Sequence, residues 1–563
     1  MRLKKLFLLS FYLLFFNSLQ AQLDPFNYSF QKSAIAKKGA VVSAHALASD
    51  AGLQMLKQGG NAIDAAIATQ LALAVVYPGA GNLGGGGFMV AHLKNGQSIA
   101  LDYRETAPAK AGKDMYLDSN GNAVTEWSQL GHLASGTPGT VAGLFAAHKY
   151  AKLPFKRLIA PAIELAEKGF AVSEREASSL NEAREDFLRF NKFKTAFTKD
   201  ADWKAGDILV QKDLANTLKR MRDFGEKGFY EGETAKLIEQ NMYRNGGIIT
   251  LNDLKNYKAK KRTAINFFYK GYQVLTMPLP SSGGIILQQM MGMVEEKNIA
   301  SLKFQTAASV QLMVEAERRA FADRAEFLGD ADFVKVPVKT LTSKKYLAEQ
   351  MLDFVPGQAG RSSYVGPGII AEHEETTHIS IIDKEGNAVA VTTTLNGGYG
   401  SRVVIEGAGF LMNNEMDDFS IKPGVPNMYG AIGNAANAIA PGKRMLSSMT
   451  PTIVLKNKKP YIVAGTPGGT TIPTSVFQTL INLLEFGMKA PEAVYLPKFH
   501  HQWLPDKVFI EAGFNAAAEK KLETMGYMLE KRGPIGRTEL ILIKNGIIHA
   551  VADNRGDDDA RAF

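Results

Sequence analysis

Thr376 stands where a hydroxyl group could be held rigidly for chemistry. It lies in the run Glu375-Thr376-Thr377-His378 and precedes a β-hairpin pattern, with strands expected at Ile379–Asp383 and Ala388–Thr394 around a turn at Lys384–Asn387. Positioned chemistry needs a rigid backbone of this kind. Threonine is also a common strand former, and the local pattern alone favours a structural role. The rest of the chain reverses that preference.

Further polar and glycine positions gather between residues 376 and 470. They are Thr394, Asn396, Glu415, Asp418, Ser447, Ser448, Gly468 and Gly469. Glu415 and Asp418 are three residues apart, so a turn could direct both carboxylates into one pocket, where they would attract a cation. The two serines offer neutral hydroxyl donors. Gly468 and Gly469 follow a predicted strand and leave backbone N–H groups bare, as an oxyanion site requires.

The sequence motifs do not support a phosphate-binding loop, a metal site or a serine hydrolase. The glycine run Gly84–Gly87 lacks the Gly-Lys-Ser/Thr ending of a phosphate-binding loop and follows a helix pattern. His500 and His501 have no partner at the ligand spacing of a helical metal site, so no metal is expected. A serine nucleophile elbow is absent from the sequence.

The N-terminus has the layout of a secretory signal. Arg2, Lys4 and Lys5 precede the apolar run Leu6–Phe16, which is short for a membrane span, and cleavage after Ala21 is expected. We therefore expect an exported protein without stable membrane insertion, in the periplasm by preference or else secreted. A retained anchor helix is the alternative.

Composition narrows the chemistry further. The chain of 563 residues has no cysteine, which excludes thiol nucleophiles, zinc–thiolate sites and disulfides. Its net charge of +9 is spread over separated short clusters, as on solvated faces, so nucleic acid is not an expected partner.

Helical and strand patterns arrive in blocks without repeats or long linkers, which indicates one large interwoven domain. Helices are expected at 46–58, 61–76, 157–168, 214–224, 285–297, 307–327, 344–354, 475–488 and 515–525. Besides the hairpin after Thr376, hairpins are expected at 88–103, 452–465 and 539–551. Antiparallel hairpins between helical blocks predict an α/β fold of four layers, in which two stacked, mainly antiparallel sheets lie between helix layers.

Together these motifs resemble the γ-glutamyltranspeptidase (γ-glutamyltransferase) family of the N-terminal-nucleophile hydrolase superfamily, over nearly the whole mature chain. The residues that carry the resemblance are Gly84–Gly87, Asp102–Glu105, Ala134–Gly143, Pro280–Gly284, Thr376–His378, Asn413–Ser420, Leu446–Met449 and Gly465–Gly469. The resemblance implies a precursor that cuts itself between Glu375 and Thr376. The products would be a large subunit (22–375) and a small subunit (376–563), which together form one heterodimeric unit.

The resemblance also implies roles for single residues. Thr376 would be the nucleophile, and its freed α-amino group would be the base. Thr394 would orient the Thr376 hydroxyl, and the backbone N–H groups of Gly468 and Gly469 would form the oxyanion hole. The remaining implied roles are a clamp for the substrate α-carboxylate at Arg104, Ser447 and Ser448, acceptors for its α-ammonium at Asn396, Glu415 and Asp418, and a lid at Pro423–Arg444 with Tyr429 as its gate.

The implied reaction needs no metal and no organic cofactor. A γ-glutamyl compound such as glutathione, glutamine or a γ-glutamyl peptide forms an ester with Thr376, and water or an amino acid or peptide then receives the γ-glutamyl group. Two features depart from the family pattern: Glu415 stands where many bacterial members have glutamine, and Gly397-Gly398 follow Asn396 where bulkier residues are familiar.

The alternatives are a glutaryl or cephalosporin acylase on the same scaffold and a non-catalytic periplasmic binding protein. Asp418 argues against the acylase, because a glutaryl group has no α-ammonium.

Overall fold

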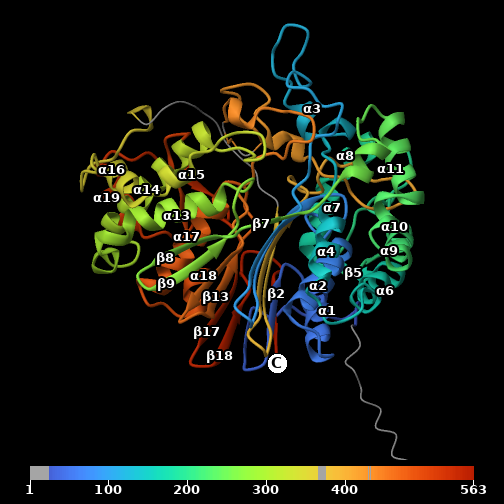
Figure 1. Ribbon diagram of the computed structural model, residues 1–563, viewed down its shortest axis with the longest axis horizontal. Helices are drawn as coiled ribbons and strands as arrows, with labels where there is room; N and C mark the ends of the chain where they lie inside the picture. Colours follow the sequence, from blue (N-terminus) through green and yellow to red (C-terminus); the bar gives the residue numbers. More distant parts are fainter. Residues whose placement is uncertain (1–23, 365–375, 429, 432) are drawn as a thin grey trace, which may run out of the picture.

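Two stacked seven-stranded sheets form the centre of the molecule, and helices cover both outer faces (Figure 1). The computed structural model describes residues 24–364, 376–428, 430–431 and 433–563. The expected signal segment 1–21, Glu375 and Tyr429 lie outside the described residues. Every strand pairing in the two sheets is antiparallel.

The first sheet, here called sheet A, has the strand order β1-β18-β17-β13-β12-β9-β8. In that order its strands span Ser33–Ala36, Ile547–Val551, Glu539–Lys544, Lys459–Gly465, Thr452–Lys456, Tyr272–Thr276 and Ile265–Tyr269. The second, sheet B, has the order β19-β2-β10-β11-β3-β4-β7. Its strands span Asp559–Ala562, Ala40–Ser43, Thr377–Ile382, Ala388–Thr394, Gly86–His92, Ser98–Asp102 and Lys260–Arg262.

The strands of sheet B are apolar on both faces because both faces are buried. In β3, Phe88 and Val90 pack between the two sheets, whereas Met89 and Ala91 point to the helices outside. Successive side chains of a strand alternate between faces, so one strand contributes to two separate cores. This placement explains why the sequence pattern of β3 is continuously hydrophobic.

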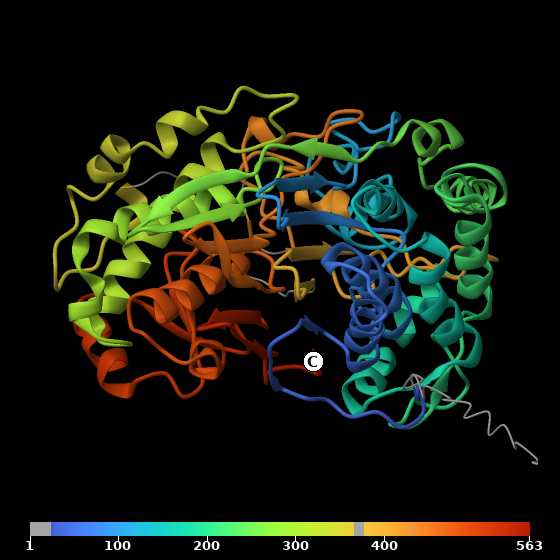
Figure 2. The same cartoon turned by 60° about the horizontal axis from the view of Figure 1, so that its bottom comes forward.

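The helix layers pack on the outer apolar faces of the two sheets. α1 (Ala46–Lys57), α2 (Ala62–Val76) and α4 (Thr140–His148) lie against sheet B, and α6 (Ala160–Lys168) packs on α2. α13 (Gly283–Val294), α17 (Thr471–Leu484) and α18 (Ala490–Tyr495) lie against sheet A; α14 (Ala307–Phe327) packs on α13, and α19 (Ala516–Thr524) packs on α14. Figure 2 shows the two helix groups on opposite sides of the strands. The expected four-layer arrangement is confirmed.

Smaller elements complete the molecule. The other helices are α3 (Glu126–Gln129), α5 (Phe155–Leu158), α7 (Glu174–Glu182), α8 (Arg184–Phe190), α9 (Lys212–Phe224), α10 (Lys227–Tyr230), α11 (Gly232–Arg244), α12 (Leu251–Asn256), α15 (Val338–Leu341) and α16 (Lys344–Gln350). Two small sheets pair β5 (Phe170–Ala171) with β6 (Ile208–Leu209), and β14 (Phe499–His500) with β15 (Val508–Glu511) and β16 (Leu529–Arg532).

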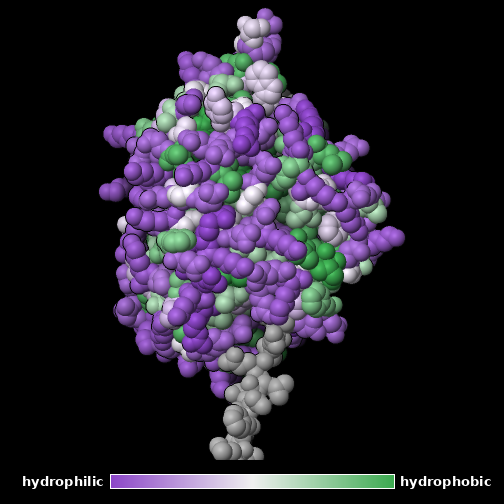
Figure 3. All heavy atoms as spheres, turned by 90° about the vertical axis from the view of Figure 1, so that its right-hand side faces the viewer, coloured by the Kyte–Doolittle hydropathy of each residue, from purple (hydrophilic) through white to green (hydrophobic). Residues whose placement is uncertain are grey.

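The exterior of the α9–α11 side is mainly hydrophilic, with scattered apolar side chains (Figure 3). Phe224 and Tyr243 are among the exposed aromatic residues there. Single exposed apolar residues are ordinary on protein surfaces. Among the residues described, no helix combines the length and apolar character needed to cross a membrane.

Most expected elements are present, with differences at their ends. The α14 helix has the expected bounds, and Asn61 caps α2 through hydrogen bonds from the N–H groups of Ile63 and Asp64. The helix expected at 157–168 is instead two helices, α5 and α6, because Pro161 is tolerated in a first turn but not inside a helix. The helix expected at 475–488 runs from Thr471 to Leu484, with Pro473 in its first turn.

Candidate active site

Thr376 lies at the entrance of β10, next to Thr394 at the end of β11. In β10, Ile379 and Ile381 face the helices and Ile382 faces sheet A, so Thr376 falls on the side of sheet B that faces sheet A. Its side chain is 4% exposed, and its Oγ1 lies 3.4 Å from Oγ1 of Thr394. The register of the hairpin therefore brings the two hydroxyl groups together.

The loop after β11 is fixed to the same threonine pair. The backbone N–H of Asn396 donates a hydrogen bond of 2.8 Å to Oγ1 of Thr394. Asn396 has a φ of 78°, a left-handed conformation that asparagine adopts more readily than most residues. Its Nδ2 donates to the backbone oxygen of Asn414 at 3.1 Å.

Gly468 and Gly469 form the turn between β13 and α17. Their φ angles are 134° and 48°, which are strained for other residues. The N–H groups of Thr471 and Ile472 donate back to the carbonyl oxygens of Gly468 and Gly469. The turn thus lies at the N-terminal end of α17, where backbone N–H groups and the helix dipole favour a negative charge.

A small cavity of about 20 Å³ joins these elements. Of the sequence-predicted site residues, it is lined by Arg104, Thr376, Thr394, Asn396, Asp418, Ser447, Ser448 and Gly469. Gly468 is adjacent to this set in the chain, and Glu415 contacts Arg104. The volume suffices for about one water molecule, so a larger ligand requires the cavity walls to move.

Arg104 is the centre of charge in the cavity. It follows β4 and is almost completely buried. A short 3-10 turn, Glu415–Asp418, directs both of its end carboxylates to this guanidinium group: Nη1 lies 2.5 Å from Glu415, and Nη2 contacts Asp418. Glu105 lies 3.7 Å from Nη1. The predicted carboxylate pair therefore meets a cation of the protein itself.

Burial and charge act in opposite directions on this cluster. Burial lowers the pKa of Arg104, but Glu415, Asp418 and Glu105 raise it, and the result lies above the ordinary value. Burial raises the pKa of Asp418 above its ordinary value although Arg104 lowers it. Burial likewise raises the pKa of Glu105 to about 8. Glu105 therefore retains a proton near neutral pH and adds little negative charge beside Arg104.

Ser447 and Ser448 also line the cavity, and the backbone of Ser447 is bound to Ser282. The hydroxyl and N–H groups of Ser282 donate to the backbone oxygen of Ser447 at 2.6 and 2.7 Å. Arg324 of α14 donates to Oγ of Ser448 at 3.4 Å and to Oγ of Ser282 at 3.2 Å. Burial lowers the pKa of Arg324 to about 10, against an opposing effect of Asp418. The site thus contains a second buried arginine.

Two described residues of the segment expected to form a lid, Asn427 and Ala431, line the cavity. Nδ2 of Asn427 donates to Oδ1 of Asp418 at 2.8 Å. Nδ2 of Asn396 contacts the sulfur of Met428 at 3.6 Å. Tyr429, the predicted gate, lies outside the described residues, as does Glu375 before the predicted cleavage point.

A family model described as Gamma-glutamyltranspeptidase matches residues 48–563. The chain belongs to the gamma-glutamyltranspeptidase family.

Relatives agree with this assignment. The chain is 47% identical over 534 residues to the glutathione hydrolase proenzyme of Escherichia coli strain K12, covering 94% of this chain and 92% of the relative. The solved gamma-glutamyltranspeptidase of Helicobacter pylori is 46% identical, with a TM-score of 0.57 over 61% of this chain and 97% of that chain. A cephalosporin acylase from Bacillus halodurans has a TM-score of 0.83 at 26% identity, covering 96% and 99% of the two chains.

Membership of the gamma-glutamyltranspeptidase family makes this protein an enzyme of the N-terminal-nucleophile hydrolase superfamily. Within this family member, sequence reasoning missed Arg324 and Asn427. Arg324 belongs to a helix rich in charged residues. That composition is typical of a solvent-exposed helix, whereas this helix is buried. Asn427 carries no signal of its own, and only its place in the predicted lid could have indicated it.

Proposed function

We propose that this protein cleaves itself between Glu375 and Thr376 and then uses Thr376 to transfer γ-glutamyl groups. The observation that carries the proposal is the buried hydroxyl pair of Thr376 and Thr394, 3.4 Å apart, in one cavity with Arg104 and Gly469. The word proenzyme in the name of the Escherichia coli relative supports a precursor. The solved Helicobacter pylori chain spans 61% of this chain, about the share of a fragment that ends at residue 375.

Self-cleavage begins with the Thr376 hydroxyl oxygen attacking the carbonyl carbon of Glu375. The peptide C–N bond breaks, the hydroxyl proton is transferred to the leaving nitrogen, and an ester joins Glu375 to Oγ1 of Thr376. Water hydrolyses this ester and leaves a carboxylate on Glu375 and a free α-amino group on Thr376. The new amine has a reference pKa of roughly 7.7–8.0, so it accepts a proton near neutral pH.

Substrate recognition uses the charges around the cavity. The α-carboxylate of a γ-glutamyl compound binds Arg104 together with Ser447 and Ser448, since a guanidinium group matches a carboxylate with two parallel hydrogen bonds. The α-ammonium binds Asp418 and Asn396, while Glu415 pairs with Arg104 and offsets part of its positive charge. Before this binding, Asn427 and the rest of the predicted lid must move, because the cavity holds only about 20 Å³.

Transfer proceeds through an ester on Thr376. Its oxygen attacks the γ-carbonyl carbon, its own amine takes up the hydroxyl proton, and the backbone N–H groups of Gly468 and Gly469 stabilise the oxyanion. The substrate C–N bond then breaks, and the leaving amine receives the proton. Water or an amino acid or peptide amine attacks the ester, which gives hydrolysis or transpeptidation. We place this activity outside the cytoplasm, by preference in the periplasm, on the basis of the signal pattern in residues 1–21.

The Thr376→Ala variant tests this proposal. We expect it to remain a single chain on a denaturing gel and to lack activity toward γ-glutamyl-p-nitroanilide, whereas Thr376→Ser, which retains a hydroxyl, still cleaves. A Thr376→Ala protein that divides between residues 375 and 376 would show that the nucleophile is assigned wrongly. A wild-type protein that stays intact after export would favour a non-catalytic binding protein.

A cephalosporin or glutaryl acylase is the second candidate. The similarity of the fold to the Bacillus halodurans cephalosporin acylase favours it. Asp418 in the cavity wall opposes it, because a carboxylate there suits an α-ammonium group, which a glutaryl group lacks. Turnover of γ-glutamyl-p-nitroanilide well above that of glutaryl-p-nitroanilide supports the first candidate, and the reverse order supports the acylase.

A further inference from the structure

Arg444 and Asp102 form a buried ion pair beside the backbone of Arg104. Nη1 of Arg444 lies 3.2 Å from Oδ2 of Asp102, the last residue of β4, and neither side chain is more than 1% exposed. Neither is among the described residues that line the candidate active-site cavity. Burial lowers the pKa of Arg444, but Asp102 and Tyr257 raise it, and the result lies above the ordinary value. The pair is therefore a permanent charge contact behind the site.

Both backbone polar groups of Arg104 are bound within this network. Its N–H donates to Oδ1 of Asp102 at 3.1 Å. Its carbonyl oxygen accepts from Nε of Arg444 at 3.1 Å and from the Tyr257 hydroxyl at 2.7 Å. The Arg444 guanidinium group also lies over the Tyr257 ring, 5.7 Å from its centroid, and its Nη2 donates to the backbone oxygen of Lys258 at 2.8 Å. Arg444 thus contacts the carbonyl oxygen, the second donor to that oxygen, and Asp102.

The side chain of Arg104 binds the chain around Arg444 in return. Its Nε donates to the backbone oxygen of Met445 at 3.3 Å, and its Nη2 donates to that of Leu446 at 3.4 Å. The two site serines, which are the proposed partners of Arg104 in binding the α-carboxylate, follow Leu446 directly. The contacts between the two arginines therefore hold both parts of the proposed carboxylate site in one register.

We propose that Arg444 is a positioning residue for substrate recognition: together with Asp102 it fixes the place of the Arg104 guanidinium group relative to the two site serines. This inference rests on the proposed function, in which Arg104 binds the α-carboxylate of a γ-glutamyl compound. A guanidinium group forms two parallel hydrogen bonds to a carboxylate only when its plane is correctly oriented. Because Arg104 also contacts Glu415 and Asp418, that orientation depends on a fixed backbone.

The neighbouring groups do not replace Arg444. Arg262 also binds Asp102, with Nε 3.0 Å from Oδ2, but it is more exposed and divides its hydrogen bonds with a second aspartate. Burial raises the pKa of Tyr257, which therefore carries no charge to pair with Asp102. Within the described part of the chain, only Arg444 contacts both the Asp102 carboxylate and the carbonyl oxygen of Arg104.

Arg444→Lys tests this inference. Lysine keeps the charge, but one ammonium group cannot reproduce the separate contacts with Asp102, the Arg104 oxygen and the Lys258 oxygen. We expect KM for γ-glutamyl-p-nitroanilide to rise about threefold to tenfold, the equivalent of one hydrogen bond. We expect kcat to stay at the wild-type value, because the α-carboxylate is bound alike in the ground state and the transition state. Rates are taken per cleaved molecule, and thermal unfolding reports whether the variant folds.

A double-mutant cycle with Arg104→Lys separates positioning from a general effect on the fold. If Arg444 acts through the Arg104 guanidinium group, Arg444→Lys should change kcat/KM little once residue 104 is lysine. A purely structural role would lower kcat/KM by the same factor in both backgrounds. That result would overturn the inference, as would an unchanged KM in the single variant. If Arg104→Lys itself leaves KM unchanged, recognition in the proposed function fails instead, so the two failures are distinguishable.

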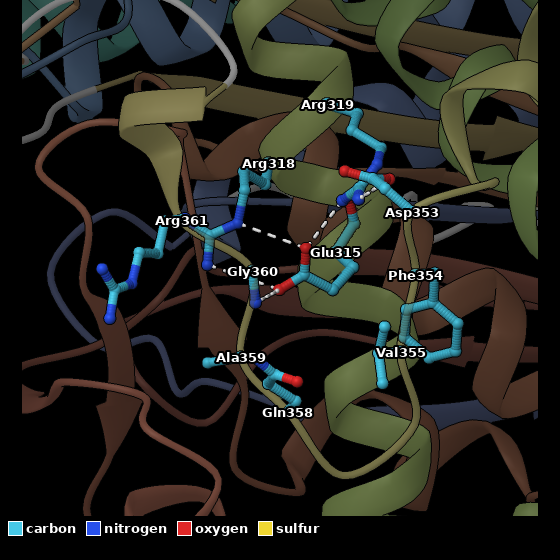
Figure 4. A pocket seen from close by; sticks show the side chains of 10 residues that line it. All are labelled: Glu315, Arg318, Arg319, Asp353, Phe354, Val355, Gln358, Ala359, Gly360 and Arg361. Carbon is cyan, nitrogen blue, oxygen red and sulfur yellow. Dashed lines mark hydrogen bonds and ion pairs between the residues drawn. The ribbon is translucent and has the colours of Figure 1, made fainter.

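Arg319→Lys is the matched control (Figure 4). Arg319 is 3% exposed, and like Arg444 it donates to two backbone oxygens, those of Gln350 and Glu315, and contacts carboxylates, those of Glu315 and Asp353. It lines a separate cavity of about 410 Å³ that shares no lining residue with the candidate active site. We expect this variant to keep the wild-type KM. An equal rise in KM in the two lysine variants would contradict the inference, because it would follow from the loss of any buried guanidinium group.

Asp102→Asn provides a second variant of the same ion pair. The amide oxygen can still accept from the N–H of Arg104, but the charge that Arg444 binds is lost. We expect a similar rise in KM, and again little change in kcat/KM in the Arg104→Lys background. This variant decides the question if Arg444→Lys does not fold, and a wild-type KM in folded Asp102→Asn protein would refute the positioning role.

Discussion

Nη1 of Arg104 lies 2.5 Å from the carboxylate of Glu415, and both side chains are almost completely buried. Nη2 of the same guanidinium group contacts Asp418. One cation thus holds the two ends of the short turn that forms a wall of the cavity. The positions of Arg104 and Asp418 are therefore mutually dependent.

Arg104→Lys is expected to weaken substrate binding strongly. An ammonium group cannot reproduce the forked contacts with Glu415 and Asp418 and still bind a carboxylate in two places. We expect KM for γ-glutamyl-p-nitroanilide to rise about tenfold to a hundredfold, while self-cleavage continues. Steady-state kinetics on the purified, cleaved variant measure this, and an unchanged KM would remove Arg104 from substrate binding.

Asp418→Asn should separate recognition from maturation. The amide keeps the shape of the side chain and can still accept from Asn427, but it no longer carries a charge for an α-ammonium group. We expect KM to rise by about tenfold or more with little change in the cleavage rate. If self-cleavage falls as much as recognition does, Asp418 supports the fold of the precursor instead.

Thr394→Val should reduce turnover with little effect on binding. Valine has nearly the same shape and suits a strand, but it removes the hydroxyl near Thr376 and leaves the N–H of Asn396 without its acceptor. We expect kcat to fall by about tenfold, the equivalent of one hydrogen bond in a buried site. Thr394→Ser is the control and should retain most of the activity; equal losses in the two variants would argue against a role for the hydroxyl.

Because of the raised pKa of Asp417, we expect the free energy of unfolding to decrease as pH rises. Burial raises its pKa from 3.8 to about 7, although Ser128 and the N–H of Met428 donate to it and lower it. Between about pH 4 and pH 7 the folded state binds this proton and the unfolded state does not, so the free energy of unfolding decreases as pH increases.

Asp417→Asn removes this dependence. The amide can accept from Met428 and donate to Ser128, whose hydroxyl then donates to the backbone oxygen of Thr125. We expect the variant to gain thermal stability relative to the wild type at pH 8 and to gain less at pH 5, measured as Tm in matched buffers. A difference independent of pH would show that Asp417 does not hold its proton in the folded protein.

Periodicity and turn residues predicted much of the fold. The hairpin after Thr376 followed from the alternation around Lys384–Asn387, and α14 followed from its long helical pattern. Pro161 explains why one expected helix is two. In each case the decisive information is local, because it depends on residues a few positions apart.

The charge network of the site could not be predicted in the same way. Arg104 and Glu415 are far apart in sequence, and only the stacking of β4 near the 3-10 turn makes them neighbours. Arg324 and Arg318 appear as ordinary charged residues of α14, because the sequence does not show that the helix is covered on all sides. The family resemblance indicated Arg104 as a site residue, but only the fold shows that it contacts Glu415 and Asp418.

N-terminal sequencing of the fragments in purified, active protein tests the central claim most directly. The account predicts that the smaller fragment begins Thr-Thr-His-Ile-Ser, with Thr376 as its first residue. Full activity in a preparation that contains no fragment with this start would contradict it.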